Sequence, residues 1–302
     1  MPRFGSVVTA MVTPFGPDGS LDLDAAVTVA RHLASTGSDA LVVAGTTGEG
    51  PVLTDAERIE LFRAVVGAVT IPVVASTGTN DTAHSIMLTK EAKASGADGI
   101  LVVTPYYNRP SAAGLSAHFR AVAAASDLQV VLYDIPVRSG RRIGPGLTLE
   151  LARDVPSIVA VKDATGDVAS AATVVAGSPA GFEVYCGDDS LTLPFVAVGG
   201  VGVISVAAHW AGPQFAEMVA AHRAGEVERA MLINQRLGGS YRFQSTEDYP
   251  NPVPAKAACR VLGLPVGQCR LPNAVAPGSL DEQARAVLSE LGRLDAAHQT
   301  VA

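Results

Sequence analysis

The chain of 302 residues contains only four lysines, and a lysine amine that is shielded from water can attack a carbonyl carbon to form an imine. Lys90 and Lys93 fall in a segment of helical periodicity, and Lys256 falls in a second such segment near the C-terminus. Lys162 instead ends a short apolar run, which predicts a buried strand. Lys162 is therefore the candidate nucleophile. The alternative is an ion pair with Asp163 or another carboxylate.

Hydroxyl and guanidinium groups follow other apolar runs. Tyr133 closes one run, where its phenol could transfer a proton, although aromatic side chains at strand ends more often serve packing. Thr46 and Thr47 form a hydroxyl pair in a glycine-flanked turn, which could bind a carboxylate or cap a helix. Arg138 could bind an acidic substrate, or it could pair with Asp134. Each residue taken alone leaves both interpretations open.

The acidic and imidazole side chains give no pattern typical of a metal centre. Asp188 and Asp189 are adjacent, so their side chains point in different directions, and we expect them to cap a helix or brace a loop. The six histidines show neither HxH nor HExxH spacing, which disfavours a metal-dependent reaction. The three cysteines form no CxxC motif, which favours a reducing, cytoplasmic compartment.

These candidate residues need elements that bring strand ends together. Short β-branched runs alternate with longer stretches of helical periodicity, which is typical of a parallel sheet with crossover helices. The predicted strands are residues 7–14, 40–45, 72–77, 99–105, 129–136, 158–162, 182–186 and 202–207. Eight strands with helices between them predict a (β/α)8 barrel, whose active site lies at the carboxyl ends of the strands.

The segment after the eighth strand contains helical patterns and no strand candidate, so we expect a C-terminal α-helical appendage. We place the boundary near residue 225, with a barrel of residues 1–225 and a helical region of residues 226–302. Within the barrel, Thr54 and Glu57 have the spacing of a capping box. Asp81 is expected to cap a helix that Gly96 ends.

Composition narrows the class of partner. Apolar residues make up 48% of the chain and charged residues 17%, which favours a compact globule over disorder. The formal charge of −7 argues against nucleic acid or an anionic membrane as the partner. No stretch has the layout of a signal peptide or the length of a membrane span. A soluble, cytoplasmic protein that binds a small molecule is the expectation.

Taken together and in order, the predicted strand ends resemble the dihydrodipicolinate synthase and N-acetylneuraminate lyase family of class I pyruvate aldolases. The resemblance covers nearly the whole chain. It rests on the phrases VVTAMVTPF, GTTGE, VTPYYNRP, LYDIPVRSG, VKDATGD, GDD, GVISV and, in the helical tail, NPVPAKAA.

The resemblance implies catalytic roles for four residues. Lys162 falls where the family has its Schiff-base lysine, and Tyr133 falls where it has the tyrosine that relays protons. Thr46 and Tyr107 match the other two members of the proton relay. In the family a neighbouring subunit donates the residue at the Tyr107 position, so the resemblance implies a homo-oligomer, a dimer or a tetramer.

The resemblance also implies substrate contacts. Thr47 matches the residue that holds the pyruvate carboxylate, Gly187 and Ile204 match positions that line the imine site, and Arg138 matches the carboxylate clamp for the second substrate. The implied reaction is condensation of pyruvate with L-aspartate-β-semialdehyde to 4-hydroxytetrahydrodipicolinate for lysine and diaminopimelate synthesis. No metal or organic cofactor is expected. The alternatives are a related aldolase or lyase that acts on a sugar keto acid or other aldehyde, and a non-catalytic pyruvate-binding paralogue.

Many members of the family also resemble one another in an interface pocket that binds L-lysine as a feedback inhibitor, and this sequence matches that pocket only in part. Asn80 and Tyr106 fall at matching positions. His84 stands where lysine-sensitive members carry a glutamate, and Asp55 and Arg58 stand where they carry histidines. The resemblance therefore implies weak inhibition by L-lysine, or none.

Overall fold

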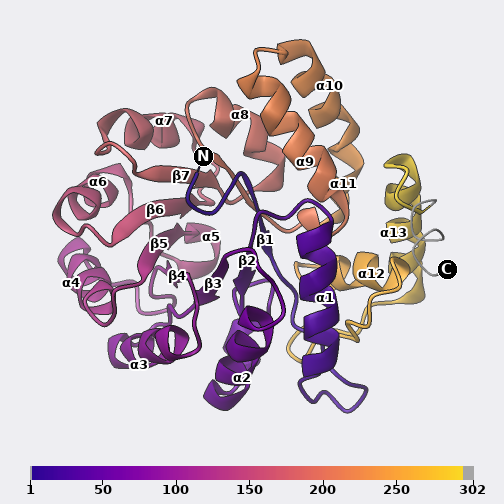
Figure 1. Ribbon diagram of the computed structural model, residues 1–302, viewed down its shortest axis with the longest axis horizontal. Helices are drawn as coiled ribbons and strands as arrows, with labels where there is room; N and C mark the ends of the chain where they lie inside the picture. The colour runs from indigo at the N-terminus through magenta and orange to yellow at the C-terminus, as the bar shows by residue number, and fades with distance from the viewer. Residues whose placement is uncertain (1, 295–302) are drawn as a thin grey trace.

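The computed structural model describes residues 2–294 of the chain. At its centre, eight parallel strands follow one another in sequence order, and β8 pairs with β1 to close the ring (Figure 1). This arrangement confirms the predicted (β/α)8 barrel. The strands are β1 (Val7–Ala10), β2 (Ala40–Val43), β3 (Val73–Ser76), β4 (Gly99–Val103), β5 (Gln129–Asp134), β6 (Ile158–Asp163), β7 (Glu183–Cys186) and β8 (Gly202–Ser205).

The strands begin within one residue of their predicted positions, but several of them end earlier than predicted. The largest difference is at β1, which was expected to reach residue 14 and ends at Ala10. Beyond Ala10, the backbone N–H of Met11 still donates to the Val42 carbonyl at 2.9 Å. Pro14 has no N–H to continue such a ladder, and apolar composition alone does not reveal where the backbone pairing stops.

Helices occupy the connections between strands and surround the barrel (Figure 1). They are α1 (Leu23–Ser35), α2 (Asp55–Val66), α3 (Thr82–Ala94), α4 (Ala112–Ala123), α5 (Pro136–Ser139), α6 (Pro145–Asp154), α7 (Val168–Gly177), α8 (Thr192–Ala197) and α9 (Ala208–Arg223), with 3₁₀ turns η1 (Gly50–Val52) and η2 (Asp189–Leu191). The predicted C-terminal helices are α10 (Val227–Arg236), α11 (Gly238–Phe243), α12 (Val253–Val261) and α13 (Gly278–Glu290). Helix α10 packs on α9, and α12 contacts both α9 and α13. None of the helices within residues 2–294 is both long enough and apolar enough to cross a membrane.

The predicted helix caps are present. The Thr54 hydroxyl accepts a hydrogen bond from the Glu57 N–H, and the Glu57 carboxylate accepts one from the Thr54 N–H, which completes the capping box of α2. Asp81 caps α3 by accepting from the His84 N–H at 2.7 Å. Helix α3 ends at Ala94, and Gly96 follows with a φ of +83°, a left-handed conformation that glycine adopts without strain.

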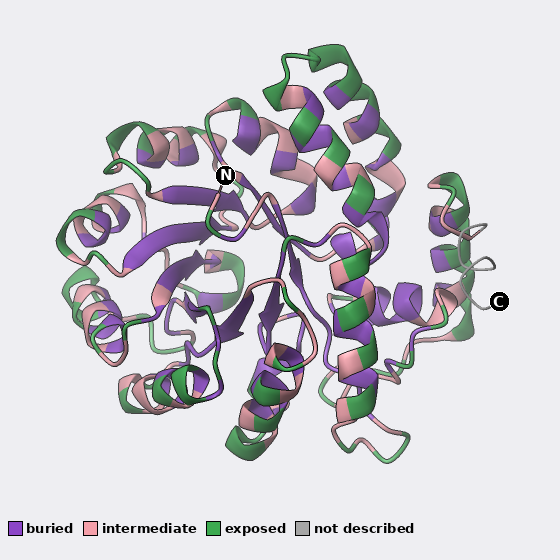
Figure 2. Cartoon of the chain, in the orientation of Figure 1, coloured by how far each residue is buried: buried purple, intermediate pink, exposed green. Residues whose placement is uncertain are grey.

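The apolar core has two parts. One fills the interior of the barrel and includes Val8, Val74, Leu101 and Tyr185. The other lies between the strands and the surrounding helices, so strand residues alternate between the two parts. Figure 2 shows strands buried along their length and helices that expose only their outer faces. Because both faces of every strand are covered, the strands are nearly continuous apolar runs.

Candidate active site

The register of the barrel brings the amine and the phenol together. On the paired strands β5 and β6, Tyr133 lies opposite Lys162, and both side chains are buried. The Nζ atom of Lys162 lies 4.3 Å from the centroid of the Tyr133 ring. The neighbouring Asp163 carboxylate instead accepts hydrogen bonds from the backbone N–H and hydroxyl of Thr165, at 2.9 and 2.7 Å. The alternative ion pair between Lys162 and Asp163 is therefore not formed.

A pocket of about 230 Å³ surrounds Lys162 at the carboxyl ends of the strands. Six of the eight predicted site residues line it: Thr46, Thr47, Tyr133, Arg138, Lys162 and Gly187. The strands from which these residues come are far apart in the sequence. Closure of the barrel therefore accounts for their meeting.

The hydroxyl pair sits in the turn that follows β2. Thr47 is buried and Thr46 is half-buried, and the Thr47 hydroxyl oxygen accepts a hydrogen bond from Nδ2 of Asn251 at 3.0 Å. The cap of η1 is Glu49 and that of α2 is Thr54. The helix-cap interpretation of Thr46 and Thr47 is therefore wrong.

Arg138 lies on α5, immediately after β5, where its side chain is exposed and its Nη2 donates to the Asn251 carbonyl at 3.4 Å. The Asp134 carboxylate is turned away and accepts from the backbone N–H groups of Ile143 and Gly144, at 3.0 and 3.3 Å. Burial raises the pKa of Asp134 to about 6. Asp134 is therefore not the ion-pair partner of Arg138.

Gly187 allows β6 and β7 to approach closely at the edge of the pocket. Its N–H donates to the Asp163 carbonyl at 2.7 Å, and a Cβ at this position would lie only 2.7 Å from the Cβ of Ala164. Larger side chains are therefore excluded.

Asp188 accepts from the Ser190 N–H, and the buried Asp189 accepts from the Val206 N–H and from other groups of the loop after β8. The predicted bracing role of Asp188 and Asp189 is confirmed.

Two predicted residues lie outside the pocket of this single chain. Ile204 is buried in the barrel interior, and Val206 is the neighbouring residue that lines the pocket. Tyr107 follows β4, is 91% exposed, and has a backbone φ of +70°. A non-glycine residue in that conformation is uncommon, and Tyr107 is not among the residues that line the Lys162 pocket of its own chain.

A second cavity, of about 300 Å³, adjoins the Lys162 pocket and shares Thr46, Tyr133 and Arg138 with it. It extends to Tyr106 and to the buried Arg58 of α2. Nη2 of Arg58 donates to the Gly50 carbonyl at 2.5 Å.

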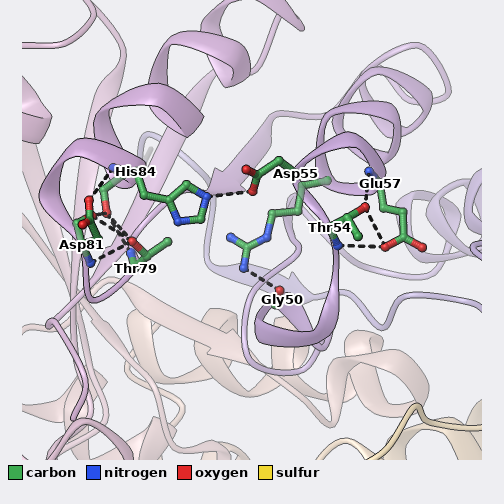
Figure 3. Close-up of polar contacts among 9 residues, drawn as sticks. Gly50, Thr54, Asp55, Glu57, Thr79, Asp81 and His84 are labelled. Carbon is green, nitrogen blue, oxygen red and sulfur yellow. Dashed lines mark hydrogen bonds and ion pairs between the residues drawn. The ribbon is translucent and has the colours of Figure 1, made fainter.

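Near this cavity, His84 of α3 reaches across to α2, and its Nε2 lies 2.7 Å from a carboxylate oxygen of Asp55 (Figure 3). Figure 3 also shows that His84 is anchored through its backbone by Asp81, so its ring bridges the starts of two helices. The Asp55 carboxylate is therefore engaged by His84.

The other three lysines are placed as predicted in the helices. Lys90 and Lys93 are exposed on α3, and Lys93 pairs with Asp127 at 2.7 Å. Lys256 of α12 is completely buried, and its Nζ lies 2.7 Å from the Glu49 carboxylate. Of the four lysines, Lys162 is the one whose side chain lines a cavity at the carboxyl ends of the strands.

Sequence reasoning missed the contribution of the segment between α11 and α12. Gln244, Ser245 and Asn251 line the Lys162 pocket, and Oδ1 of Asn251 is buried without a hydrogen-bond partner. The phrase NPVPAKAA was noted, but Asn251 was given no role, because nothing in its local pattern links it to Thr47, 204 residues away.

Within residues 2–294, no group of three or more histidine, cysteine, aspartate or glutamate side chains is arranged to hold a metal ion.

A closed barrel that gathers an amine, a phenol and a guanidinium around one pocket at its strand ends has the architecture of a (β/α)8-barrel enzyme. The model of the dihydrodipicolinate synthetase family matches residues 3–291. The chain belongs to this family.

Individual relatives agree with this assignment. The 4-hydroxy-tetrahydrodipicolinate synthase of Moorella thermoacetica is 50% identical over 97% of this chain and 100% of its own length. The crystal structure of the dihydrodipicolinate synthase of Cyanidioschyzon merolae, solved with lysine bound, is 42% identical, has a TM-score of 0.93, and covers 97% of this chain and 100% of its own. A monomeric dihydrodipicolinate synthase variant is 35% identical with a TM-score of 0.92, over 96% of this chain and 98% of its own.

Proposed function

We propose that this enzyme condenses pyruvate with L-aspartate-β-semialdehyde to form 4-hydroxytetrahydrodipicolinate, in the synthesis of diaminopimelate and lysine. The observation that carries the proposal is the buried amine of Lys162, 4.3 Å from the Tyr133 ring centroid in a pocket also lined by Arg138. The full-length relative from Moorella thermoacetica bears the name of this activity.

The reaction follows from the placement of these groups. The Lys162 amine attacks the ketone carbon of pyruvate, and loss of water gives an imine. Loss of a methyl proton then gives an enamine, because the protonated imine accepts the electron pair. The enamine carbon attacks the aldehyde, the product's own amine displaces Lys162 in closing a ring, and Lys162 is released. No metal or organic cofactor is required for these steps.

The remaining pocket residues bind substrates and move protons. Tyr133 and Thr46 relay protons, and Thr47 with the N–H groups of its turn holds the pyruvate carboxylate. Gly187 shapes the site of the imine at the edge of the pocket, and Ile204 supports it from the barrel interior. Arg138 binds the carboxylate of the semialdehyde, since its guanidinium borders both the Lys162 pocket and the adjoining cavity.

The proton relay is completed by Tyr107 of a second copy of the chain. Its 91% exposure in the single chain supports a role outside its own pocket. A homodimer is therefore the smallest active unit, and a tetramer would be a pair of such dimers. The enzyme would act in the cytoplasm.

Borohydride trapping tests the central step. Incubation with pyruvate and sodium borohydride should add one reduced pyruvate to Lys162, to be identified by mass analysis of peptides, and Lys162→Ala should abolish the addition. Lys90→Ala serves as the matched control, because Lys90 is exposed on α3, and it should label normally. Labelling at Lys256 or Lys90 in the unmodified protein would contradict the proposal.

The acceptor is tested separately by turnover with a panel of aldehydes. L-aspartate-β-semialdehyde should give the highest kcat/KM. A sugar aldehyde preferred over it would assign the chain to another aldolase activity, and trapping without turnover of any aldehyde would indicate a pyruvate-binding protein.

A further inference from the structure

Lys256 and Glu49 form an ion pair in the interior of the molecule. The side chains are 0% and 1% exposed, and the charged atoms are 2.7 Å apart. Nζ of Lys256 also donates to the Gln268 carbonyl at 2.9 Å and lies 4.2 Å from the centroid of the Phe15 ring. The second oxygen of Glu49 accepts from the Arg270 N–H at 2.9 Å. The pair therefore joins the turn after β2 to two parts of the C-terminal region.

Stability alone does not explain a pair of this kind. Removing two charges from water costs free energy that their attraction often fails to recover, and apolar side chains of similar size commonly serve as well or better. What a buried pair does provide in some proteins is a single fixed arrangement of the segments that carry it. Glu49 belongs to the turn that contains Thr46 and Thr47, so this turn is one of the segments that the pair would fix.

This turn is constrained at both of its ends. Glu49 has a φ of +54°, and a Cβ on the next residue, Gly50, would lie 2.3 Å from the Ala44 carbonyl oxygen. At the other end, Asn251 donates to the Thr47 hydroxyl at 3.0 Å. Asn251 and Lys256 both belong to the segment that leads into α12 and its first two turns. One C-terminal segment thus holds the turn at two points, one in the pocket and one behind it.

We infer that the Glu49–Lys256 pair is a positioning device for the pyruvate site: it fixes the turn so that the Thr46 and Thr47 hydroxyls face the Lys162 pocket. The inference rests on the proposed function, because it assigns pyruvate to that pocket. Neither Glu49 nor Lys256 lines the pocket, so both act through the threonines. Loss of the pair should weaken pyruvate binding before it affects the intrinsic reactivity of Lys162.

The test is the double variant Glu49→Gln with Lys256→Met. Glutamine keeps an acceptor for the Arg270 N–H, and methionine fills the volume of the lysine stem, so no unpaired charge is left in the interior. The dependence of borohydride trapping on pyruvate concentration is then measured. We expect the half-saturating pyruvate concentration to rise by about ten-fold or more, as for loss of an aligned charge-assisted contact. The trapping rate at saturation should fall much less.

The matched control is the double variant Arg260→Gln with Asp281→Asn. It removes another ion pair of the C-terminal region, at 2.6 Å between α12 and α13, which does not contact the turn. Its half-saturating pyruvate concentration should stay within about two-fold of that of the unmodified protein. A merely structural role would lower the fraction of folded protein, and hence the amplitude of trapping, without shifting the concentration dependence.

A second variant, Glu49→Asp, is measured if the double variant does not fold. It keeps both charges but shortens the carboxylate arm by one methylene, so the turn must move for the pair to form. It should also raise the half-saturating pyruvate concentration. A folded variant of either kind with unchanged concentration dependence overturns the positioning role. Absence of trapping at Lys162 in the unmodified protein would instead overturn the proposed function.

Discussion

At the scale of single residues, Tyr133 is the group whose chemistry is most open to test. Its phenol faces the amine that it is proposed to serve, so removing only the hydroxyl separates proton transfer from packing. In Tyr133→Phe we expect imine formation to persist more slowly, with kcat lower by about two to four orders of magnitude. Steady-state turnover and borohydride trapping measure the two effects. An unchanged kcat would remove Tyr133 from the mechanism.

Arg138 should act on the second substrate. Its guanidinium is exposed at the border of the two cavities, and Asp134 does not neutralise it. Arg138→Ala should therefore raise the KM for the semialdehyde by about ten- to a hundred-fold, as for loss of a charge-assisted contact. Trapping with pyruvate should be nearly normal. If use of the semialdehyde and trapping with pyruvate were lost equally, Arg138 would instead maintain the structure of the pocket.

His209 contributes stability that is lost in acid. It is fully buried, accepts from the Val12 N–H through Nε2, and burial lowers its pKa to about 4. Because this pKa lies below the ordinary value near 6.5, its contribution to stability is complete above about pH 6.5 and is lost as pH falls toward 4. The loss is on the order of 3 kcal/mol. The pKa values of Asp134 and Asp189 are raised to about 6. These carboxyl groups therefore add stability as the pH falls through the same range, which offsets the loss from His209.

A variant isolates the histidine from these opposing groups. The free energy of unfolding is measured by urea titration for the unmodified protein and for His209→Gln at several pH values. The advantage of the unmodified protein should shrink as pH falls from about 6.5 to 4. A constant difference would show that His209 does not titrate in this range.

At the scale of elements, the starts of α2 and α3 carry the prediction about L-lysine. The resemblance places His84 where lysine-sensitive members carry a glutamate, and Asp55 is the nearby carboxylate that could partly replace it. The Asp55 carboxylate is engaged by His84 at 2.7 Å (Figure 3), while the nearby Arg58 adds a positive charge beside the cavity. Neither arrangement favours a cationic ligand.

We therefore expect half-inhibition only above about 1 mM L-lysine in a steady-state titration. His84→Glu is the matched gain-of-sensitivity variant, because it restores a carboxylate at the start of α3. It should lower the concentration of L-lysine needed for half-inhibition. Half-inhibition of the unmodified enzyme well below 1 mM would contradict the argument from His84.

The elements were more predictable than their contacts. Strand and helix signals are local, so β-branched runs and caps such as Thr54 and Asp81 located the barrel units correctly. The barrel then brought six predicted residues to one pocket, because parallel strands place their carboxyl ends at the same edge. The contacts of Asn251 with Thr47 and of Lys256 with Glu49 span about 200 residues. No local periodicity encodes a contact of that range.

At the scale of the whole molecule, the role proposed for Tyr107 would link activity to assembly. Tyr107 is 91% exposed in one chain, and the proposed relay needs its phenol in the pocket of another. Dilution, or a substitution at the subunit contact that yields monomers, should lower activity in parallel with the fraction of dimer. Sedimentation and activity measured on the same samples check this. A fully active monomer would contradict a shared site.

The double tether between the pyruvate turn and the C-terminal segment determines how this protein can be recombined with its relatives. The division near residue 225, which composition suggested, remains a prediction and looks like a natural crossover point for a chimaera. A crossover there would take Thr47 and Glu49 from one parent but Asn251 and Lys256 from the other. The residues that must come from the same parent are therefore not contiguous in the sequence. A library of chimaeras should exchange residues 45–50 together with residues 251–270.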